Sequence, residues 1–265
     1  MAKKILVFVS LFFIAGCSWI NNFIPIEVDK LIGEQFAAQM SYNPMQGKVL
    51  DSVSNKEVYQ YLHKIKKNLL KSDQIKYKND FVWKLHVIDN DSVLNAFCVA
   101  GGYIYVYTGI IKFLDSEAEL AGVLAHEIAH ADCRHTTMRM ATQYGVSLMI
   151  GLMTGGDVSF LVEIARELLG LTFSRADEKE ADEHAVAYMY STPYDPRAVG
   201  GFFKKLVDKQ KDSYIPEFLS THPASENRVT DIEAKWKQLG AKEGKYFKEE
   251  HQKIVALLSK NNADF

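Results

Sequence analysis

Cysteine is scarce in this chain, and so is an excess of charge of either sign. Three cysteines among 265 residues are too few for a disulfide-rich scaffold. The 31 lysine and arginine residues are matched by 33 aspartate and glutamate residues, which gives a formal net charge of −2. Because a dedicated nucleic-acid-binding protein usually carries a basic excess, we expect no nucleic acid among the partners. Internal repeats and low-complexity tracts are also missing, so a repeat architecture is not expected.

The apolar content is sufficient for a folded core. Apolar residues make up 48% of the chain and charged residues 24%, a balance that is typical of a globular protein rather than a disordered one. A length of 265 residues allows one good-sized domain or two small ones.

The first 17 residues have the pattern of an export signal. Lys3 and Lys4 form a positive start, an apolar run follows over residues 5–14, and small residues lead to Cys17. The run is too short to span a bilayer of ~30 Å as a helix, but it has the length of a signal peptide. Its end resembles a bacterial lipobox, which implies cleavage before Cys17 and acylation of the Cys17 sulfur. The alternative is an ordinary signal peptide in which the cysteine is incidental.

Acylation of Cys17 would anchor the protein to a lipid bilayer. Ser18 resembles the residue that sorts lipoproteins to the outer membrane. We therefore expect a periplasmic location, at the inner face of the outer membrane of a Gram-negative bacterium. Disulfides persist in that oxidising compartment, and the sequence leaves open whether Cys98 and Cys133 form one.

Hydrophobic periodicity predicts a mostly helical protein with a small sheet. Residues 18–51 contain several turn formers and are expected to form a loose lead-in with a short helix near Ile32–Met40. A helical pattern over Ser54–Lys71 is followed by strand patterns at Phe81–Ile88 and Tyr103–Tyr107. Later helices are predicted at 117–135, 138–153, 160–171, 176–190, 196–210, 224–239 and 251–258. The expected fold class is α+β, mostly α.

One motif carries metal chemistry. Residues 126–130 spell HEIAH, an HExxH motif, on a helix that Ser116 is expected to cap in a capping box with Glu119. Residues four apart lie one above the other on a helix, so the two histidines can reach one metal ion. Burying them on an apolar helix without partners would be costly. Catalytic zinc usually has three protein ligands, so a third ligand is expected on a later element, with residues 174–182 as the candidate segment.

Four motifs together resemble a known family. They are the series NAF, GG and TG between residues 95 and 109, HEIAH at 126–130, SRADEKEAD at 174–182 and THPASENR at 221–228. Their order is similar to that of the gluzincin zinc metallopeptidases that include the CAAX prenyl endopeptidase and HtpX. The similarity is greatest to the periplasmic lipoprotein proteases of this family, such as LoiP and BepA. It implies a zincin-like domain in which the edge strand of a small sheet borders the HExxH helix.

The resemblance implies a role for each matching residue. His126, His130 and Glu178 match the ligands of one Zn²⁺ ion per chain. Glu127 matches the general base, which takes a proton from the attacking water and passes it to the leaving amine. Asp182 matches an aspartate that holds the free N–H of a ligand histidine; the alternative is an exposed helix acid.

Two late residues each leave two interpretations open. In the lipoprotein relatives the histidine that His222 matches can approach the zinc and block it as a latch; otherwise His222 opens a surface helix at Pro223. Arg228 matches an arginine that faces the pocket, where a cation would stabilise the oxyanion; otherwise it forms an ordinary salt bridge. Glu180 lies roughly 200° round the helix from Glu178, so we expect a solvated surface acid there.

The surroundings of the motif are predicted from their position. Asn95, Ala96 and Phe97 are expected to form an exposed edge strand to which an extended peptide substrate adds. Cys133 lies one turn beyond His130, where a thiolate could compete as a ligand, although a free buried thiol is the expected state. His135 is expected to be structural. The segment 138–153 contains polar residues and is expected to be amphipathic rather than membrane-spanning.

The chain is thus predicted to have four parts: a lipoprotein signal peptide at 1–16, a lipidated tether and lead-in at 17–51, a zinc metallopeptidase domain at 52–240 and a C-terminal helical tail at 241–265. The predicted function is a zinc endopeptidase that cleaves misfolded or misassembled envelope proteins. The alternative is a chaperone-like lipoprotein that holds such clients with weak or latent proteolysis.

Overall fold

The computed structural model describes residues 23–42, 47–153, 170, 172–210, 217–223 and 227–261. The predicted signal peptide at 1–16, Cys17 and most of the predicted helix at 160–171 lie outside the described residues. Within the described residues, no helix combines the length and the apolar composition that a bilayer crossing requires.

The sheet is small, and the order of its strands matters for the site. Its strands are β1 (Lys48–Val49), β2 (Lys84–Asp89), β3 (Ala96–Val99) and β4 (Tyr103–Tyr107), in the order β1-β2-β4-β3. β2 and β4 are parallel, whereas β1 and β3 run antiparallel to their neighbours. β3 is therefore an edge strand. This confirms an edge strand at Ala96 and Phe97, with Asn95 immediately before it. The prediction that these residues are exposed is wrong for Asn95 and Ala96, which are buried.

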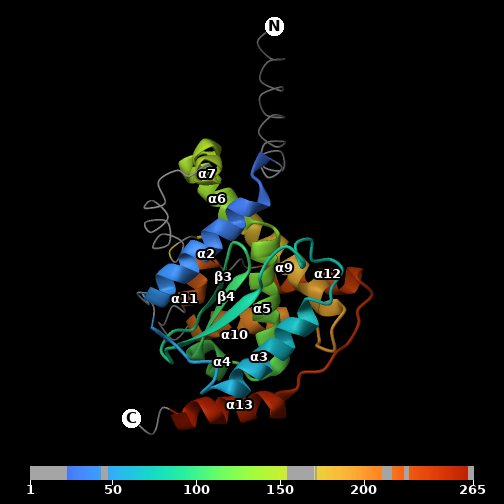
Figure 1. Ribbon diagram of the computed structural model, residues 1–265. Helices are drawn as coiled ribbons and strands as arrows, with labels where there is room; N and C mark the ends of the chain where they lie inside the picture. Colours follow the sequence, from blue (N-terminus) through green and yellow to red (C-terminus); the bar gives the residue numbers. More distant parts are fainter. Residues whose placement is uncertain are drawn as a thin grey trace.

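Side chains alternate between the two faces of the sheet along each strand, and other elements cover both faces. One face, with Val87 and Ile104, joins the core under α3 (Lys56–Leu69) and α5 (Glu117–Asp132). The other face, with Tyr105 and Tyr107, is covered by α2 (Ile26–Tyr42). Figure 1 shows α2 passing diagonally over the strands.

The remaining regular secondary structure of the described chain is helical. They are α4 (Thr108–Phe113), α6 (His135–Tyr144), α7 (Val146–Met153), α9 (Arg175–Tyr190), α10 (Ala198–Gln210), α11 (Glu217–Thr221), α12 (Arg228–Gln238) and α13 (Lys248–Asn261). α5 lies at the centre, in contact with α3, α9 and α10 (Figure 1). The fold class is α+β and mostly α, as predicted.

α5 begins and ends where local chemistry requires. The Ser116 hydroxyl accepts the backbone N–H of Glu119 at 3.3 Å, so Ser116 is the predicted N-cap. The Glu119 carboxylate, however, accepts the N–H of Asp115 at 2.7 Å. α5 ends three residues before the predicted boundary because Arg134 adopts a left-handed backbone conformation with φ of 61°.

α2 is longer than the short helix predicted in a loose lead-in. Its buried side chains recur every four residues, at Val28, Ile32, Phe36 and Met40, and pack on the sheet. The fully buried Asp29 pairs with Arg134 Nη2 at 2.6 Å, across the junction between α5 and α6. The part of the lead-in that forms α2 therefore belongs to the core.

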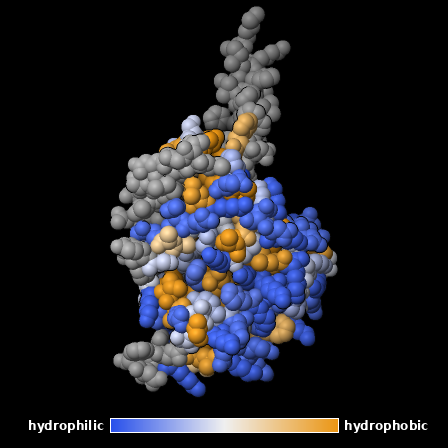
Figure 2. All heavy atoms as spheres, in the orientation of Figure 1, coloured by the Kyte–Doolittle hydropathy of each residue, from blue (hydrophilic) through white to orange (hydrophobic). Residues whose placement is uncertain are grey.

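The predicted amphipathic segment 138–153 is divided between α6 and α7. Gly145, with φ of 89°, separates the two helices. Figure 2 shows hydrophobic residues gathered at the end of the molecule where α7 and the start of α2 lie in Figure 1. Phe23, at 54% exposure, and Ile150, at 39%, are among the most exposed large apolar side chains of the described residues.

Candidate metal centre

Two helices and the loop that follows α11 bring four metal-ligating side chains together. His126 and His130 project from α5, and Glu178 from the first turn of α9. α9 begins with a capping box, in which the Ser174 hydroxyl accepts the N–H of Asp177 and the Asp177 carboxylate accepts that of Ser174. His222 follows directly after α11. All four side chains are buried.

The ligating atoms converge on one small space. His126 Nε2 lies 3.0 Å from His130 Nε2 and 3.3 Å from His222 Nδ1. Glu178 Oε1 lies 3.4 Å from His130 Nε2 and 3.0 Å from His222 Nδ1. Glu178 Oε2 lies 3.5 Å from His126 Nε2. The sequence motifs at 126–130, 174–182 and 221–228 thus meet in space.

This donor set fits zinc. Tetrahedral zinc with bonds of ~2.0–2.1 Å holds neighbouring ligand atoms about 3.3 Å apart, which is close to the separations between these atoms. Histidine nitrogens and a carboxylate oxygen are the ligands of catalytic zinc sites. Two imidazole nitrogens that face each other at 3.0 Å can share only one proton. A cation between them satisfies both lone pairs.

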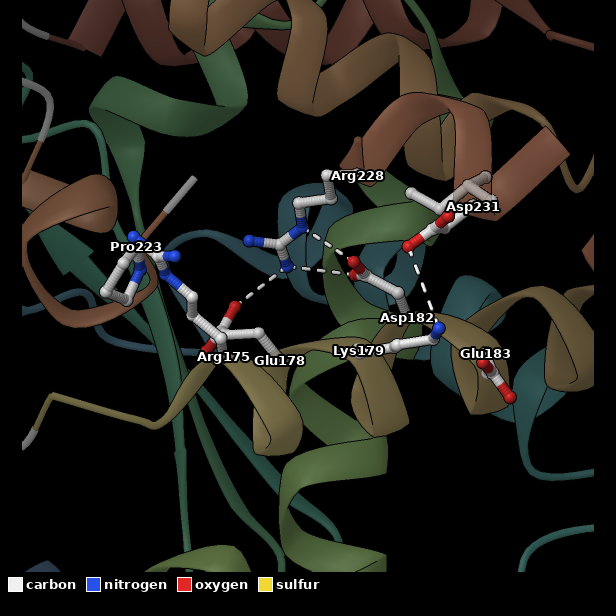
Figure 3. A pocket seen from close by; sticks show the side chains of 9 residues that line it. Arg175, Glu178, Lys179, Asp182, Glu183, Pro223, Arg228 and Asp231 are labelled. Carbon is white, nitrogen blue, oxygen red and sulfur yellow. Dashed lines mark hydrogen bonds and ion pairs between the residues drawn. The ribbon is translucent and has the colours of Figure 1, made fainter. Parts of the chain in front are cut away.

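An ion-pair network contacts His126 on the side of the ring opposite the metal space. Its Nδ1 lies 2.9 Å from Asp182 Oδ1, so the Nδ1–H can donate to the carboxylate while Nε2 faces the metal space. Arg228 pairs with Asp182 through Nε at 2.6 Å and with Glu178 Oε2 through Nη2 at 2.9 Å. Figure 3 shows the guanidinium of Arg228 lying between the two carboxylates of α9. Asp182 is buried rather than exposed.

The second ring nitrogen of His130 also has a partner, which was not predicted from the sequence. His135 Nδ1 lies 2.9 Å from His130 Nδ1, and His135 Nε2 lies 3.3 Å from Glu180 Oε2. If His130 Nε2 binds a metal, its Nδ1 must carry the proton and donate to His135 Nδ1. His135 then donates its Nε2–H to Glu180. The left-handed turn at Arg134, which folds α6 back onto α5, is what brings His135 here.

Glu127 lies next to the converging atoms but is not one of them. Its Oε2 accepts the backbone N–H of Cys98 on β3 at 3.0 Å. Its Oε1 is buried without a hydrogen-bond partner among the described residues and lies 3.6 Å from His222 Nε2. The edge strand therefore fixes one carboxylate oxygen and leaves the other available to a ligand in the site.

The buried charges shift several pKa values. Burial lowers the pKa of His126, but its hydrogen bonds with Asp182 and Glu178 outweigh burial and raise it to about 9. Burial and the neighbouring His126 hold the pKa of His130 well below its usual value. Burial alone would raise the pKa of Glu178. The charge of His222 and the hydrogen bonds with the histidines outweigh burial, so the pKa lies below its usual value. Without a metal, the pKa of His126 therefore lies above that of His130.

A narrow cavity adjoins Glu127 on the side of the edge strand. Its lining combines aromatic and apolar side chains with polar ones. The lining residues are Phe36, Asn95, Phe97, Cys98, Val99, Glu127, Thr136, Phe173, Thr221 and His222. The predicted residues Asn95 and Phe97 thus reach the catalytic motif, whereas Ala96 is fully buried in the core.

The two late residues differ in how they match the alternatives: Arg228 does form salt bridges, with Glu178 and Asp182. His222 follows α11, which was not predicted, and it is buried rather than at the surface. The His222 ring stacks on Phe218 of α11 at 4.2 Å. Cys98 and Cys133 are both free thiols.

Comparison with known proteins gives a family for this geometry. Residues 56–235 match the profile described as peptidase family M48. The chain is similar to the mitochondrial metalloendopeptidase OMA1 of Schizosaccharomyces pombe, with 34% identity over 161 residues, 58% of this chain and 47% of that protein.

Two bacterial relatives have similar levels of identity. The putative beta-barrel assembly-enhancing protease of Vibrio cholerae is 33% identical over 162 residues, 56% of this chain and 34% of that protein. The beta-barrel assembly-enhancing protease of Escherichia coli K12 is 30% identical over 167 residues, 58% of this chain and 34% of that protein. The matching segment thus spans about a third of the length of these bacterial relatives.

Proposed function

This chain belongs to peptidase family M48, and from that premise we propose that it is a zinc-dependent endopeptidase. The observation that carries the proposal is the convergence of His126, His130 and Glu178 beside Glu127. These three residues would hold the zinc ion. When bound, zinc polarises a carbonyl oxygen and lowers the pKa of water.

Glu127 is the proposed general base. Its Oε1 has no hydrogen-bond partner among the residues that the structure describes, and it lies 3.6 Å from His222 Nε2. Burial raises the pKa of Glu127, which brings it nearer to the neutral range in which a general base works best. We infer that Oε1 takes the proton of the attacking water and later gives it to the leaving amine. The N–H of Cys98 keeps the carboxylate oriented during both transfers.

Arg228 is proposed to stabilise the oxyanion of the acyl-transfer step. Its Nη2 is engaged by Glu178 and Asp182, but its buried Nη1 has no hydrogen-bond partner among the described residues. A buried, unpaired cationic donor is suited to negative charge that develops only in the transition state. The guanidinium also lies over the Phe203 ring, 3.3 Å from its centroid, which restricts its position.

The substrate is proposed to be an extended segment of an unfolded protein. β3 is an edge strand beside Glu127, and an edge strand can accept a peptide through main-chain hydrogen bonds. That mode reads the backbone more than the side chains. It suits a protease for misfolded or misassembled envelope proteins, and two bacterial relatives are named as beta-barrel assembly-enhancing proteases.

His222 is proposed to act as a latch. Its Nδ1 lies 3.3 Å from His126 Nε2, and its Nε2 lies 3.6 Å from Glu127 Oε1. The ring therefore occupies the space that water and substrate need. The variant His222→Ala should cleave an unfolded casein substrate faster than the wild-type chain while binding the same amount of zinc. An unchanged or lower rate with full zinc content would contradict the latch.

The alternative function is a client-holding lipoprotein with latent proteolysis, and the position of His222 across the site favours it as a resting state. The variant Glu127→Gln separates the two functions. We expect it to keep one zinc per chain but to lose casein cleavage by about 10²–10⁴-fold, the contribution of general base catalysis. Glu183→Gln, on the solvent side of α9, is the matched control. Full activity in Glu127→Gln would refute the proposed mechanism.

A further inference from the structure

A second cluster of metal-ligating atoms lies outside the site described above. Ligating atoms of Cys133, Glu180 and His184 all lie within 4.8 Å of one another. Cys133 is the C-cap residue of α5, and Glu180 and His184 are one turn apart on α9. The four-residue spacing on one helix is the same as in HExxH, so both α9 side chains can reach one ion. α5 and α9 are packed against each other, which fixes the third ligand opposite them.

The backbone of Cys133 and the side chains of Glu180 and His184 already make contacts. The backbone N–H of Cys133 donates to the Ala129 carbonyl at 2.8 Å. Glu180 Oε2 lies 3.3 Å from His135 Nε2. The His184 ring lies 5.6 Å from the ring of Tyr188, one turn further along α9. Binding an ion would therefore require little additional ordering of the ligands.

The charge around the thiol favours a cation. Burial raises the pKa of Cys133, and the charges of Glu180, Asp132 and Asp177 raise it further, against only a small opposing effect of Lys76. The thiol is therefore protonated when no cation is present and is a poor nucleophile. A divalent cation would replace that proton and offset the negative charge of the surrounding carboxylates.

We propose that Cys133, Glu180 and His184 form a second metal site, for a borderline divalent cation such as Zn²⁺. A thiolate, an imidazole and a carboxylate together suit zinc, whereas Mg²⁺ and Ca²⁺ prefer oxygen ligands alone. Three protein ligands leave a fourth position for water. Glu180 is exposed and Cys133 and His184 are half-buried, so an ion can enter from solvent. Glu180 also joins this site to the first through His135 and His130.

The presence of sulfur makes the two sites distinguishable. The first site contains only nitrogen and oxygen donors, so Co²⁺ bound there gives no thiolate charge-transfer band. We expect titration of the full metal-depleted chain with Co²⁺ to produce that near-ultraviolet band together with a stoichiometry of two ions per chain. The proposal predicts loss of the band and of one ion in Cys133→Ser, with the other ion retained.

A second variant guards against a folding defect in Cys133→Ser. His184→Ala leaves the thiol in place and should weaken the cobalt affinity that the band reports by at least about tenfold, since losing a ligand costs no less than losing a ligand's hydrogen-bond partner. Glu183→Gln, whose carboxylate faces Lys235 at 3.8 Å, is the matched control for Glu180→Gln, which should weaken the band. Circular dichroism confirms the fold of each variant.

The other cysteines provide the decisive controls. Cys98→Ser and Cys17→Ser should both keep the band. A band that is absent from the wild-type chain, that persists in Cys133→Ser, or that disappears in Cys98→Ser would overturn the proposal. These readouts do not depend on proteolysis, so they stand or fall separately from the proposed endopeptidase.

Discussion

At the scale of single residues, each ligand histidine of the candidate centre has a partner for its second nitrogen. His126 faces Asp182 at 2.9 Å, and His130 faces His135 at 2.9 Å. Such partners fix the tautomer and the ring orientation that metal binding needs. The two arrangements differ, because the partner of His126 is a carboxylate and the partner of His130 is an imidazole. The hydrogen bond with Asp182 helps to raise the pKa of His126.

Protons should therefore compete with zinc. The pKa of His126 is raised to about 9 in the metal-free chain, so the ring is mostly protonated at neutral pH and must lose that proton to bind zinc. We expect the apparent zinc affinity to rise by up to about tenfold per pH unit from neutral pH to about pH 9 and then to level off. Competition with a chromophoric chelator at a series of pH values measures this.

Asp182→Asn is the informative variant for the pH dependence. It removes the carboxylate whose hydrogen bond raises the pKa of His126, so the affinity should level off at a lower pH. Zinc binding at high pH should weaken by about 10–100-fold because the ligand loses its hydrogen-bonding anion. A pH profile identical to that of the wild-type chain would contradict the role given to Asp182.

At the scale of elements, the N-terminal helix α2 and the catalytic helix α5 are joined by a buried ion pair. Asp29 accepts from the Arg134 guanidinium at 2.6 Å and from the Thr137 hydroxyl at 2.6 Å. Gly33 permits the close approach of α2, since a Cβ there would lie 2.2 Å from the carbonyl oxygen of Ala100. The same Arg134 forms the left-handed turn that places His135 behind His130. The lead-in thus contributes to the geometry of the centre.

Asp29→Asn should destabilise the whole domain. It leaves the Arg134 guanidinium buried without its anion, a change that costs about 3–5 kcal/mol in comparable buried pairs. Urea unfolding followed by circular dichroism measures the loss, and Glu27→Gln, which alters an exposed acid on the same helix, should change stability by less than about 0.5 kcal/mol. Equal stability of the two variants would show that α2 is not held by this pair.

The sequence predicted those parts of the site that depend on short motifs. HExxH lies on one helix and the glutamate segment on another, so local periodicity placed His126, His130 and Glu178 correctly on α5 and α9. The interaction of Glu180 with His135 was not predicted, because it depends on the turn at Arg134 and on the packing of two helices. The extent of α2 was not predicted, although its apolar residues are spaced four apart, because asparagine and proline residues on both sides favour turns.

At the scale of the whole molecule, the apolar end of the domain lies near its N-terminal entry. Hydrophobic residues gather over α7 and the start of α2 (Figure 2), and Phe23 at that end is 54% exposed. The chain continues from there towards Cys17. A lipid anchor at Cys17 would place this end towards a bilayer, and the opposite end, with α13, towards solvent (Figure 1).

Acylation of Cys17 is directly testable. Cells that express the full chain should incorporate labelled palmitate into it, and the label should be absent from Cys17→Ser. Cys98→Ser, a change of another cysteine, should remain labelled and membrane-bound. Recovery of the unlabelled wild-type chain in the soluble fraction would contradict the anchor and the proposed location.

The central claim is that His126, His130 and Glu178 hold a catalytic zinc ion. Anomalous diffraction at the zinc absorption edge, on crystals of the full chain grown with zinc, tests it most directly. We predict an anomalous peak about 2.0–2.2 Å from His126 Nε2, His130 Nε2 and a carboxylate oxygen of Glu178, with Glu127 beside the ion but not bound to it. The absence of a peak between these three residues in a zinc-saturated crystal would contradict the account.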